Sequence, residues 1–328
     1  MSLLLSLLLA ASATVSSELI ENLSQLEKNN PKQALAEYKR QKHKYQHTFN
    51  EDTLQFHRIA IKAAINVYDW QSFMNTLTTL KKKQFAAVTE QKALHIINDI
   101  GVAYRQNNQH QDAIQHFTCA LTKTTSINYT AALKSNIATA YRVQGQPSVG
   151  FQLLDSIEFD ILDANISAGI HIVRGNIALH IEQVDKALNH FLEAKKLFQL
   201  QNKHRDSVRL TFSILTTALI KQDLALYKEY RANIENKIRE HEIENHDYLL
   251  FLDEVKHAIA IENVSSLRTQ HISELVKLLM DHDDANENVR LLLKSLNLKV
   301  LAPPGQKRQP KEPLLEPNLA SPWCESMR

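Results

Sequence analysis

Glycine and proline are scarce in this sequence, and their scarcity limits the folds open to it. There are six glycines and eight prolines among 328 residues, and only Pro31 and Pro147 come before Leu301. The chain is rich in Leu, Ala, Lys, Gln and Glu, which favour helices. So few glycines also leave little material for a phosphate-binding loop or for the sharp turn of a catalytic serine. No such motif is present, and neither is an HExxH helix.

Cysteine and net charge are also low. The only cysteines, Cys119 and Cys324, allow at most one bridge. Because Cys119 falls in the apolar pattern of a helix, we expect it to be a small buried thiol without a redox or metal role. The 38 basic and 36 acidic residues give a formal charge of +2. A charge so close to balance gives no indication of a nucleic acid or an anionic membrane surface as partner.

Fifteen histidines are more than usual, so a metal site has to be considered. His43 and His47 are four residues apart and would share one face of a helix. A stable site needs about four converging ligands. No third ligand is apparent, and Lys42 and Lys44 flank the pair with repulsive charge. We therefore expect no metal, no cofactor and no catalytic residue, and hence a protein that is not an enzyme.

The first 13 residues resemble a secretory signal peptide. Leu3 to Ala10 is almost wholly apolar, and Ala11-Ser12-Ala13 offers the small residues that signal peptidase requires. We expect cleavage after Ala13 and export, most simply to a bacterial periplasm. The segment is too short to span a bilayer. The alternative is that these residues form the first helix of the domain.

Three segments of the chain share one pattern of small and large residues at a constant step of 37 residues. A fixed period in this range is typical of stacked helical hairpins. The small residues allow two helices to cross closely, and the large ones fill the space beside the crossing. The columns hold Gly101, Ala138 and Gly175; Ala113, Gly150 and Ala187; Phe117, Leu154 and Phe191.

With Tyr104 and Tyr141, this pattern resembles the tetratricopeptide repeat family. The resemblance implies an all-α, right-handed superhelical solenoid of about six helical hairpins. The best repeats are residues 94–120, 131–157 and 168–194, and weaker matches continue over 54–80 and 205–235. The predicted domains are thus a signal peptide at 1–13, a solenoid at 14–301 and a tail at 302–328.

In that family the first helix of each hairpin lines a concave groove, so the resemblance also implies a binding surface. Its cations have no acid among them, which suggests a groove that holds an extended peptide and its carboxylates. The implied groove residues are Gln55, Arg58, Lys62, His95, Asn98, Arg105, Arg142, Asn176 and His180.

We therefore expect a non-catalytic scaffold or adaptor that binds a protein or peptide in the cell envelope. One alternative is a sensory input module of a signalling system. Another is a cytoplasmic, peptide-responsive regulator, which would require that the N-terminus is retained.

The last 27 residues change character. Six of the eight prolines lie after Leu301, and large apolar residues are few. A segment of this composition cannot bury enough surface to offset its chain entropy. We expect residues 302–328 to be disordered, with Leu314-Leu315 or Trp323 as an alternative recognition motif.

Overall fold

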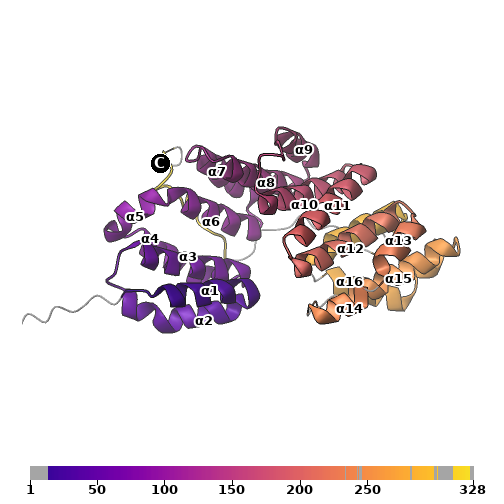
Figure 1. Ribbon diagram of the computed structural model, residues 1–328, viewed down its shortest axis with the longest axis horizontal. Helices are drawn as coiled ribbons and strands as arrows, with labels where there is room; N and C mark the ends of the chain where they lie inside the picture. The colour runs from indigo at the N-terminus through magenta and orange to yellow at the C-terminus, as the bar shows by residue number, and fades with distance from the viewer. Residues whose placement is uncertain are drawn as a thin grey trace, which may run out of the picture. The chain divides into compact units, whose positions relative to one another are not determined.

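The computed structural model describes residues 14–232, 234–241, 243, 246–280, 283–298, 301 and 313–325. Over these residues every regular element is a helix and none is a strand (Figure 1). The predicted all-α fold is confirmed. The predicted signal peptide, residues 1–13, lies outside the described residues.

The described chain does not form the single unbroken solenoid predicted for residues 14–301. It divides into two compact units, with the boundary between Thr124 and Thr125. Unit 1 combines Met1–Thr124 with Pro310–Arg328, and unit 2 is Thr125–Gln309. The C-terminal residues therefore belong with the first half of the chain.

Unit 1 is built from antiparallel helix pairs and short connecting turns, coloured indigo to magenta in Figure 1. Its elements are α1 (Ser17–Asn29), α2 (Pro31–Gln41), η1 (Lys42–Tyr45), α3 (Glu51–Asn66), α4 (Trp70–Leu80), η2 (Lys83–Phe85), α5 (Ala86–Gln91), α6 (Ala93–Gln106) and α7 (His110–Leu121).

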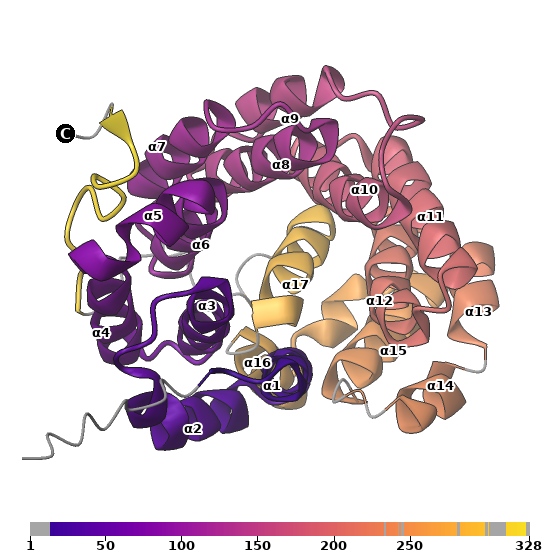
Figure 2. The same cartoon turned by 60° about the vertical axis from the view of Figure 1, so that its left-hand side comes forward.

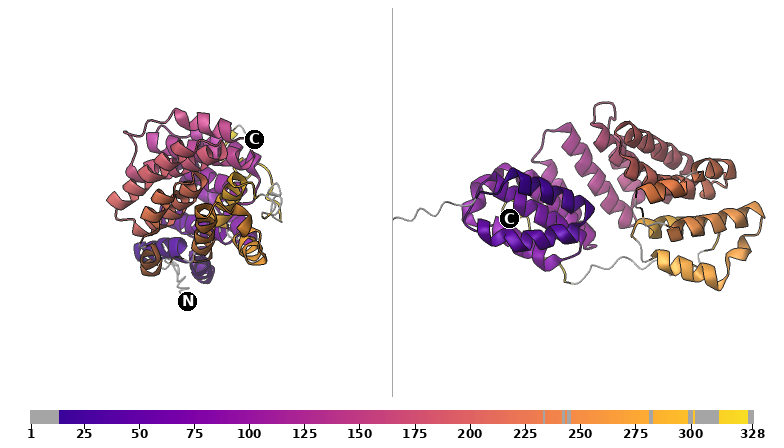
Figure 3. Two further views of the ribbon diagram at one scale, coloured as in Figure 1. Left: turned by 90° about the vertical axis from the view of Figure 1, so that its right-hand side faces the viewer. Right: turned by 60° about the horizontal axis from the view of Figure 1, so that its bottom comes forward.

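Unit 2 continues with antiparallel pairs, which lie side by side in the right-hand view of Figure 3. Its elements are α8 (Ile127–Val143), α9 (Pro147–Asp155), α10 (Ala164–His180), α11 (Val184–Leu200), α12 (His204–Ile220), α13 (Leu224–Arg231), α14 (Ile234–Glu240), α15 (His246–Ala260), η3 (Val264–Leu267), α16 (Gln270–Met280) and α17 (Asp283–Ser295).

Helix starts follow from the local sequence. The side chain of Asn30 accepts a hydrogen bond from the Gln33 amide at 3.1 Å, and Pro31 occupies the first helical position of α2. Asn50 and Asp69 cap α3 and α4 in the same way. Each cap satisfies an amide that the helix itself leaves without an acceptor.

Five hairpins turn through the same backbone conformation. One residue in each turn has a positive φ, and its successor donates a hydrogen bond to a carbonyl five residues back. This is the Schellman end of a helix. The residues are Tyr68, Asn108, Gly145, Glu182 and Gln222. They follow one another at steps of 40, 37, 37 and 40 residues, so the repeat register extends to the α12–α13 hairpin, where the sequence match is poor.

Close helix crossings lie where the repeat pattern places them. A Cβ atom added to Gly101 would meet the ring of Phe117 at 2.6 Å, and one added to Gly150 would meet the carbonyl oxygen of Ala138 at 2.7 Å. Gly175 faces Phe191 in the same manner. Ala113 and Ala187 are fully buried, as are Tyr104 and both phenylalanines, whereas Tyr141 is half-buried.

The prediction of disorder is wrong for residues 313–325, which we call the tail segment. Leu315, Leu319 and Trp323 are buried, and Cys324 is joined to Cys119 of α7 by a disulfide. The segment appears in yellow in Figure 2. Cys119 is therefore not a free thiol. The rest of the predicted tail, apart from Leu301 before it, lies outside the described residues.

Candidate functional site

Three of the predicted groove residues in unit 1 line one cavity of about 450 Å³, which we call the unit 1 cavity. Gln55 and Arg58 come from α3, and His95 comes from α6. Helix α1 supplies the opposite wall with Ser17, Ile20 and Glu21. The helical spacing of three residues puts Gln55 and Arg58 on one face of α3, so the periodic pattern accounts for this arrangement.

The cation of the unit 1 cavity already has a partner. The Nη2 atom of Arg58 lies 2.8 Å from Oδ2 of Asp99, and the two side chains are only 12% and 5% exposed. At the rim, Lys92 pairs with Glu51 at 2.5 Å. The prediction of a groove without acids is therefore wrong here. Asp99 on α6 neutralises the arginine and fixes its position.

His95 is held in its neutral form. Burial is the main cause that lowers its pKa, and the nearby Arg58 guanidinium adds to it. The neutral imidazole can offer one donor and one acceptor. With the amide of Gln55, the unit 1 cavity thus presents uncharged hydrogen-bonding groups beside a fixed ion pair. Such groups suit the backbone amides of a peptide.

The remaining predicted residues of unit 1 lie around this region. Lys62, on α3, is half-buried and acts electrostatically on Glu27 of α1, whose pKa is raised mainly by burial. Asn98 and Arg105, on α6, are half-buried. None of these three lines the unit 1 cavity.

In unit 2, two predicted groove residues converge on an acid of the same unit. Arg142 of α8 forms an ion pair with Glu287 of α17, and Nε2 of His180 on α10 lies 2.6 Å from the same carboxylate. Helix α17 packs on α12 (Figure 2) and buries Val289, Leu292 and Leu293 completely. The predicted free cation at Arg142 is therefore wrong, because α17 occupies that surface. Asn176 is half-buried on α10.

This contact makes a pH-dependent contribution to the stability of unit 2. The Arg142 guanidinium and the hydrogen bond from His180 outweigh burial and lower the pKa of Glu287 from 4.5 to about 2. A carboxylate with a depressed folded pKa stabilises the fold above its unfolded value. We expect about 2–3 kcal/mol of stability to be lost as pH falls from about 4.5 to about 2.

The substitution Glu287→Gln tests this contribution by urea unfolding at pH 7 and pH 3. The wild-type protein should lose much more stability between these pH values than the variant, which lacks the carboxylate. Glu182→Gln is the matched control, since Glu182 pairs with Lys294 of α17 at 2.7 Å but is 73% exposed. An exposed pair contributes at most about 1 kcal/mol. An equal pH dependence in all three proteins would contradict the assignment.

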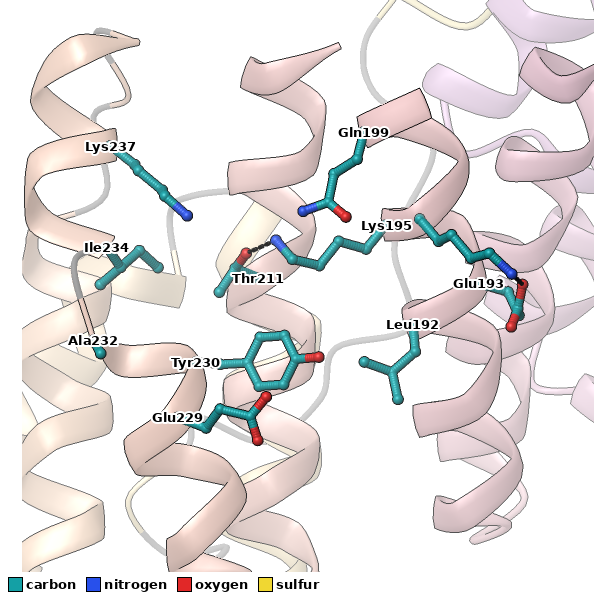
Figure 4. Close-up of a pocket in the computed structure, with 11 residues that line it drawn as sticks. Leu192, Glu193, Lys195, Gln199, Thr211, Glu229, Tyr230, Ala232, Ile234 and Lys237 are labelled. Carbon is teal, nitrogen blue, oxygen red and sulfur yellow. Dashed lines mark hydrogen bonds and ion pairs between the residues drawn. The ribbon is translucent and has the colours of Figure 1, made fainter. Parts of the chain in front are cut away.

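A further cavity in unit 2, of about 450 Å³, lies among α11, α12, α13 and α14 (Figure 4). The Nζ atom of Lys195 donates to Oγ1 of Thr211 at 2.7 Å and to the carbonyl of Ser207 at 3.1 Å. Burial, followed by the charge of Lys237, lowers the pKa of Lys195 to about 8. Because its hydrogens are directed to α12, this lysine joins two helices of the repeat.

The described residues contain no group of three or more His, Cys, Asp and Glu side chains placed to hold a metal ion. Two of the histidines lie together for another reason. His171 and His190 are in hydrogen-bond contact at 3.0 Å between α10 and α11, and burial lowers the pKa of each to about 4. Likewise, no described helix has the length and apolarity needed to cross a membrane.

Sequence reasoning missed Asp99, Glu287 and the tail segment. Asp99 carried a signal, because it is a lone acid among the apolar residues Ile96, Ile97 and Ile100. An acid in such a stripe needs a cation from another helix. Glu287 carried none, since its partners lie more than 100 residues away in the chain.

Hairpins at a fixed step, closed on small residues at each crossing, define a tetratricopeptide-like helical repeat protein. No protein-family model matches the chain, and no curated protein matches its sequence. Among solved structures, it is similar to one titled "Crystal Structure of Rap Protein Complexed with Competence and Sporulation Factor". The TM-score is 0.40 at 14% identity, over 88% of this chain and 95% of that one. A similarity at this level says nothing about what this chain binds.

Proposed function

We propose that this protein is a non-catalytic scaffold that binds a peptide or an extended segment of another protein in the unit 1 cavity. The observation that carries the proposal is the convergence of Gln55, Arg58 and His95 on one cavity of about 450 Å³. Two of these side chains offer neutral hydrogen-bonding groups, and the third is held by Asp99. This set suits binding and orientation of a peptide backbone and a carboxylate.

A catalytic role has less support. The arginine and the lysine that line the unit 1 cavity are both engaged in ion pairs. The sequence also contains none of the phosphate-binding, zinc-binding or serine-nucleophile motifs that were sought. A groove of paired charges and neutral amides is better suited to recognition than to proton transfer.

We also propose that the protein acts outside the reducing cytoplasm, in a bacterial periplasm if the source is bacterial. Two features support export: the apolar stretch before Ala13 and the disulfide between Cys119 and Cys324. Disulfides persist mainly in oxidising compartments. The same bond argues against a cytoplasmic regulator.

Site-specific crosslinking tests the binding proposal. A photoreactive amino acid at position 95 in the native source should capture one discrete partner after illumination. The control carries the same group at position 78, because Thr78 is exposed on α4, which does not line the unit 1 cavity. Equal adducts from both positions, or none from position 95, would contradict binding in the cavity.

A further inference from the structure

The tail segment lies on the hairpin α6–α7 and is held there through its backbone. The side-chain amide of Gln109 donates to the carbonyl of Leu315 at 3.0 Å and accepts from the amide of the same residue at 2.9 Å. The hydroxyl of Tyr104 donates to the carbonyl of Glu316 and accepts from the amide of Leu319 at 3.2 Å. Asn107 adds a hydrogen bond to the carbonyl of Pro313 at 3.4 Å.

His116 completes the set through a fixed tautomer. Its Nδ1 atom lies 2.7 Å from the carbonyl of Asp112, which can only accept, so Nδ1 carries the proton. Nε2 is then an acceptor, and the amide of Ala320 donates to it at 3.3 Å. Burial lowers the pKa of His116, which keeps this acceptor available at neutral pH.

Apolar anchors supply the rest of the contact. Leu315, Leu319 and Trp323 recur at a spacing of four residues and are each at most 4% exposed. The intervening side chains of Glu316 and Asn318 are exposed. Recognition thus depends on the backbone and on three anchors, and most other positions in the segment are open to substitution.

The hairpin that carries this surface is complete without the tail segment. The close crossing of α6 and α7 depends on Gly101 and Phe117, and the turn between them depends on Asn108. The tail segment is 205 residues from Cys119 along the sequence at its disulfide. Its contacts have the form of a ligand on a preformed surface. The surface is lined by Tyr104, Gln109 and His116, and none of these lines the unit 1 cavity.

We propose that the surface of Tyr104, Gln109 and His116 is a second peptide-binding site. Its ligands are peptides with two aliphatic residues and an aromatic residue at a spacing of four, and the tail segment is its resident occupant. The disulfide keeps that occupant in place. A dithiol reductant releases it by thiol–disulfide exchange: the dithiol gives up two electrons and becomes a disulfide, and Cys119 and Cys324 become thiols.

A binding experiment with the full chain tests the site directly. The substitutions Leu315→Asp, Leu319→Asp and Cys324→Ser together remove two anchors and the covalent link. A fluorescent peptide of residues 313–325 with serine at position 324 should then bind saturably to this triple variant. It should not bind to the oxidised wild-type protein, because the tethered segment has a far higher effective concentration.

Two controls separate recognition from adhesion. Adding Gln109→Ala to the triple variant should weaken binding about ten-fold, because two hydrogen bonds to the peptide backbone are lost. A peptide with Leu315→Asp should not bind. Absence of saturable binding to the folded triple variant, or equal binding after Gln109→Ala, would overturn the proposal.

Hydrogen exchange on the wild-type chain tests the same point without substitutions. On reduction, the amides of Leu315, Leu319 and Ala320 should exchange at least about ten-fold faster, because segment opening no longer requires hairpin unfolding. The amides of α6 should stay protected. Unchanged protection of the segment, or equal loss of protection in α6, would show that the segment is part of the core of unit 1 and not a ligand.

Discussion

Replacing Gly175 by alanine is expected to lower the free energy of unfolding of unit 2 by about 1–3 kcal/mol. The new methyl group would collide with the ring of Phe191, which is fully buried between α10 and α11. A buried ring has little room to move in a close-packed interior. Helices α10 and α11 would therefore have to separate, and every later contact of the repeat depends on that crossing.

Gly169 is the matched control, because it lies on the same helix. A Cβ atom added there meets nothing within 4 Å, and the residue is exposed. Gly169→Ala should therefore raise the free energy of unfolding by about 0.5–1 kcal/mol, since alanine favours the helix interior. Urea unfolding followed by circular dichroism measures both. Changes of the same sign would contradict the assigned crossing.

Loss of the disulfide is the second large effect. Breaking the bond between Cys119 and Cys324 is expected to destabilise unit 1 by about 2–4 kcal/mol. The bond closes a loop across 205 residues of sequence and so restricts the unfolded chain. Thermal unfolding of Cys119→Ala and Cys324→Ala should show the loss.

The double variant Cys119→Ala/Cys324→Ala controls for other effects of these substitutions. Because either single change breaks the same bond, the double variant should be no less stable than the weaker single variant. Additive losses would show that the two cysteines contribute separately, and unchanged stability would show that the bond is not formed.

The hairpins could be predicted because their determinants are local. Small residues at Gly101, Gly150 and Gly175 recur at a fixed step, and each faces the helix that the pattern indicates. The turn conformation at Gln222 shows that the repeat also continues where the aromatic and small residues have been lost. Main-chain geometry preserved a register that the side chains no longer reveal.

The partners of the predicted groove could not be predicted, because they are distant in sequence. Arg58 pairs with an acid 41 residues away, and His180 contacts an acid 107 residues away. Periodicity within one helix carries no information on which distant helix covers it. The result is a groove with fewer free charges than the sequence suggests.

The tail segment was misjudged for a related reason. Its proline content and low count of large apolar residues are typical of disorder. Yet Leu315, Leu319 and Trp323 are spaced four residues apart, and Cys324 follows them as the only other cysteine of the chain. Composition averages over a segment, whereas three anchors and a disulfide are enough to order it.

Binding affinity for the captured partner tests the central claim most directly. Isothermal titration should compare the wild-type chain with the variants Gln55→Ala, His95→Ala and Thr78→Ala. Arg58 is left unchanged, because its removal would strand buried Asp99. Each cavity variant should weaken binding about ten-fold, as expected for one or two lost hydrogen bonds, and Thr78→Ala should have no effect. Unchanged affinity in both cavity variants would contradict binding in the unit 1 cavity.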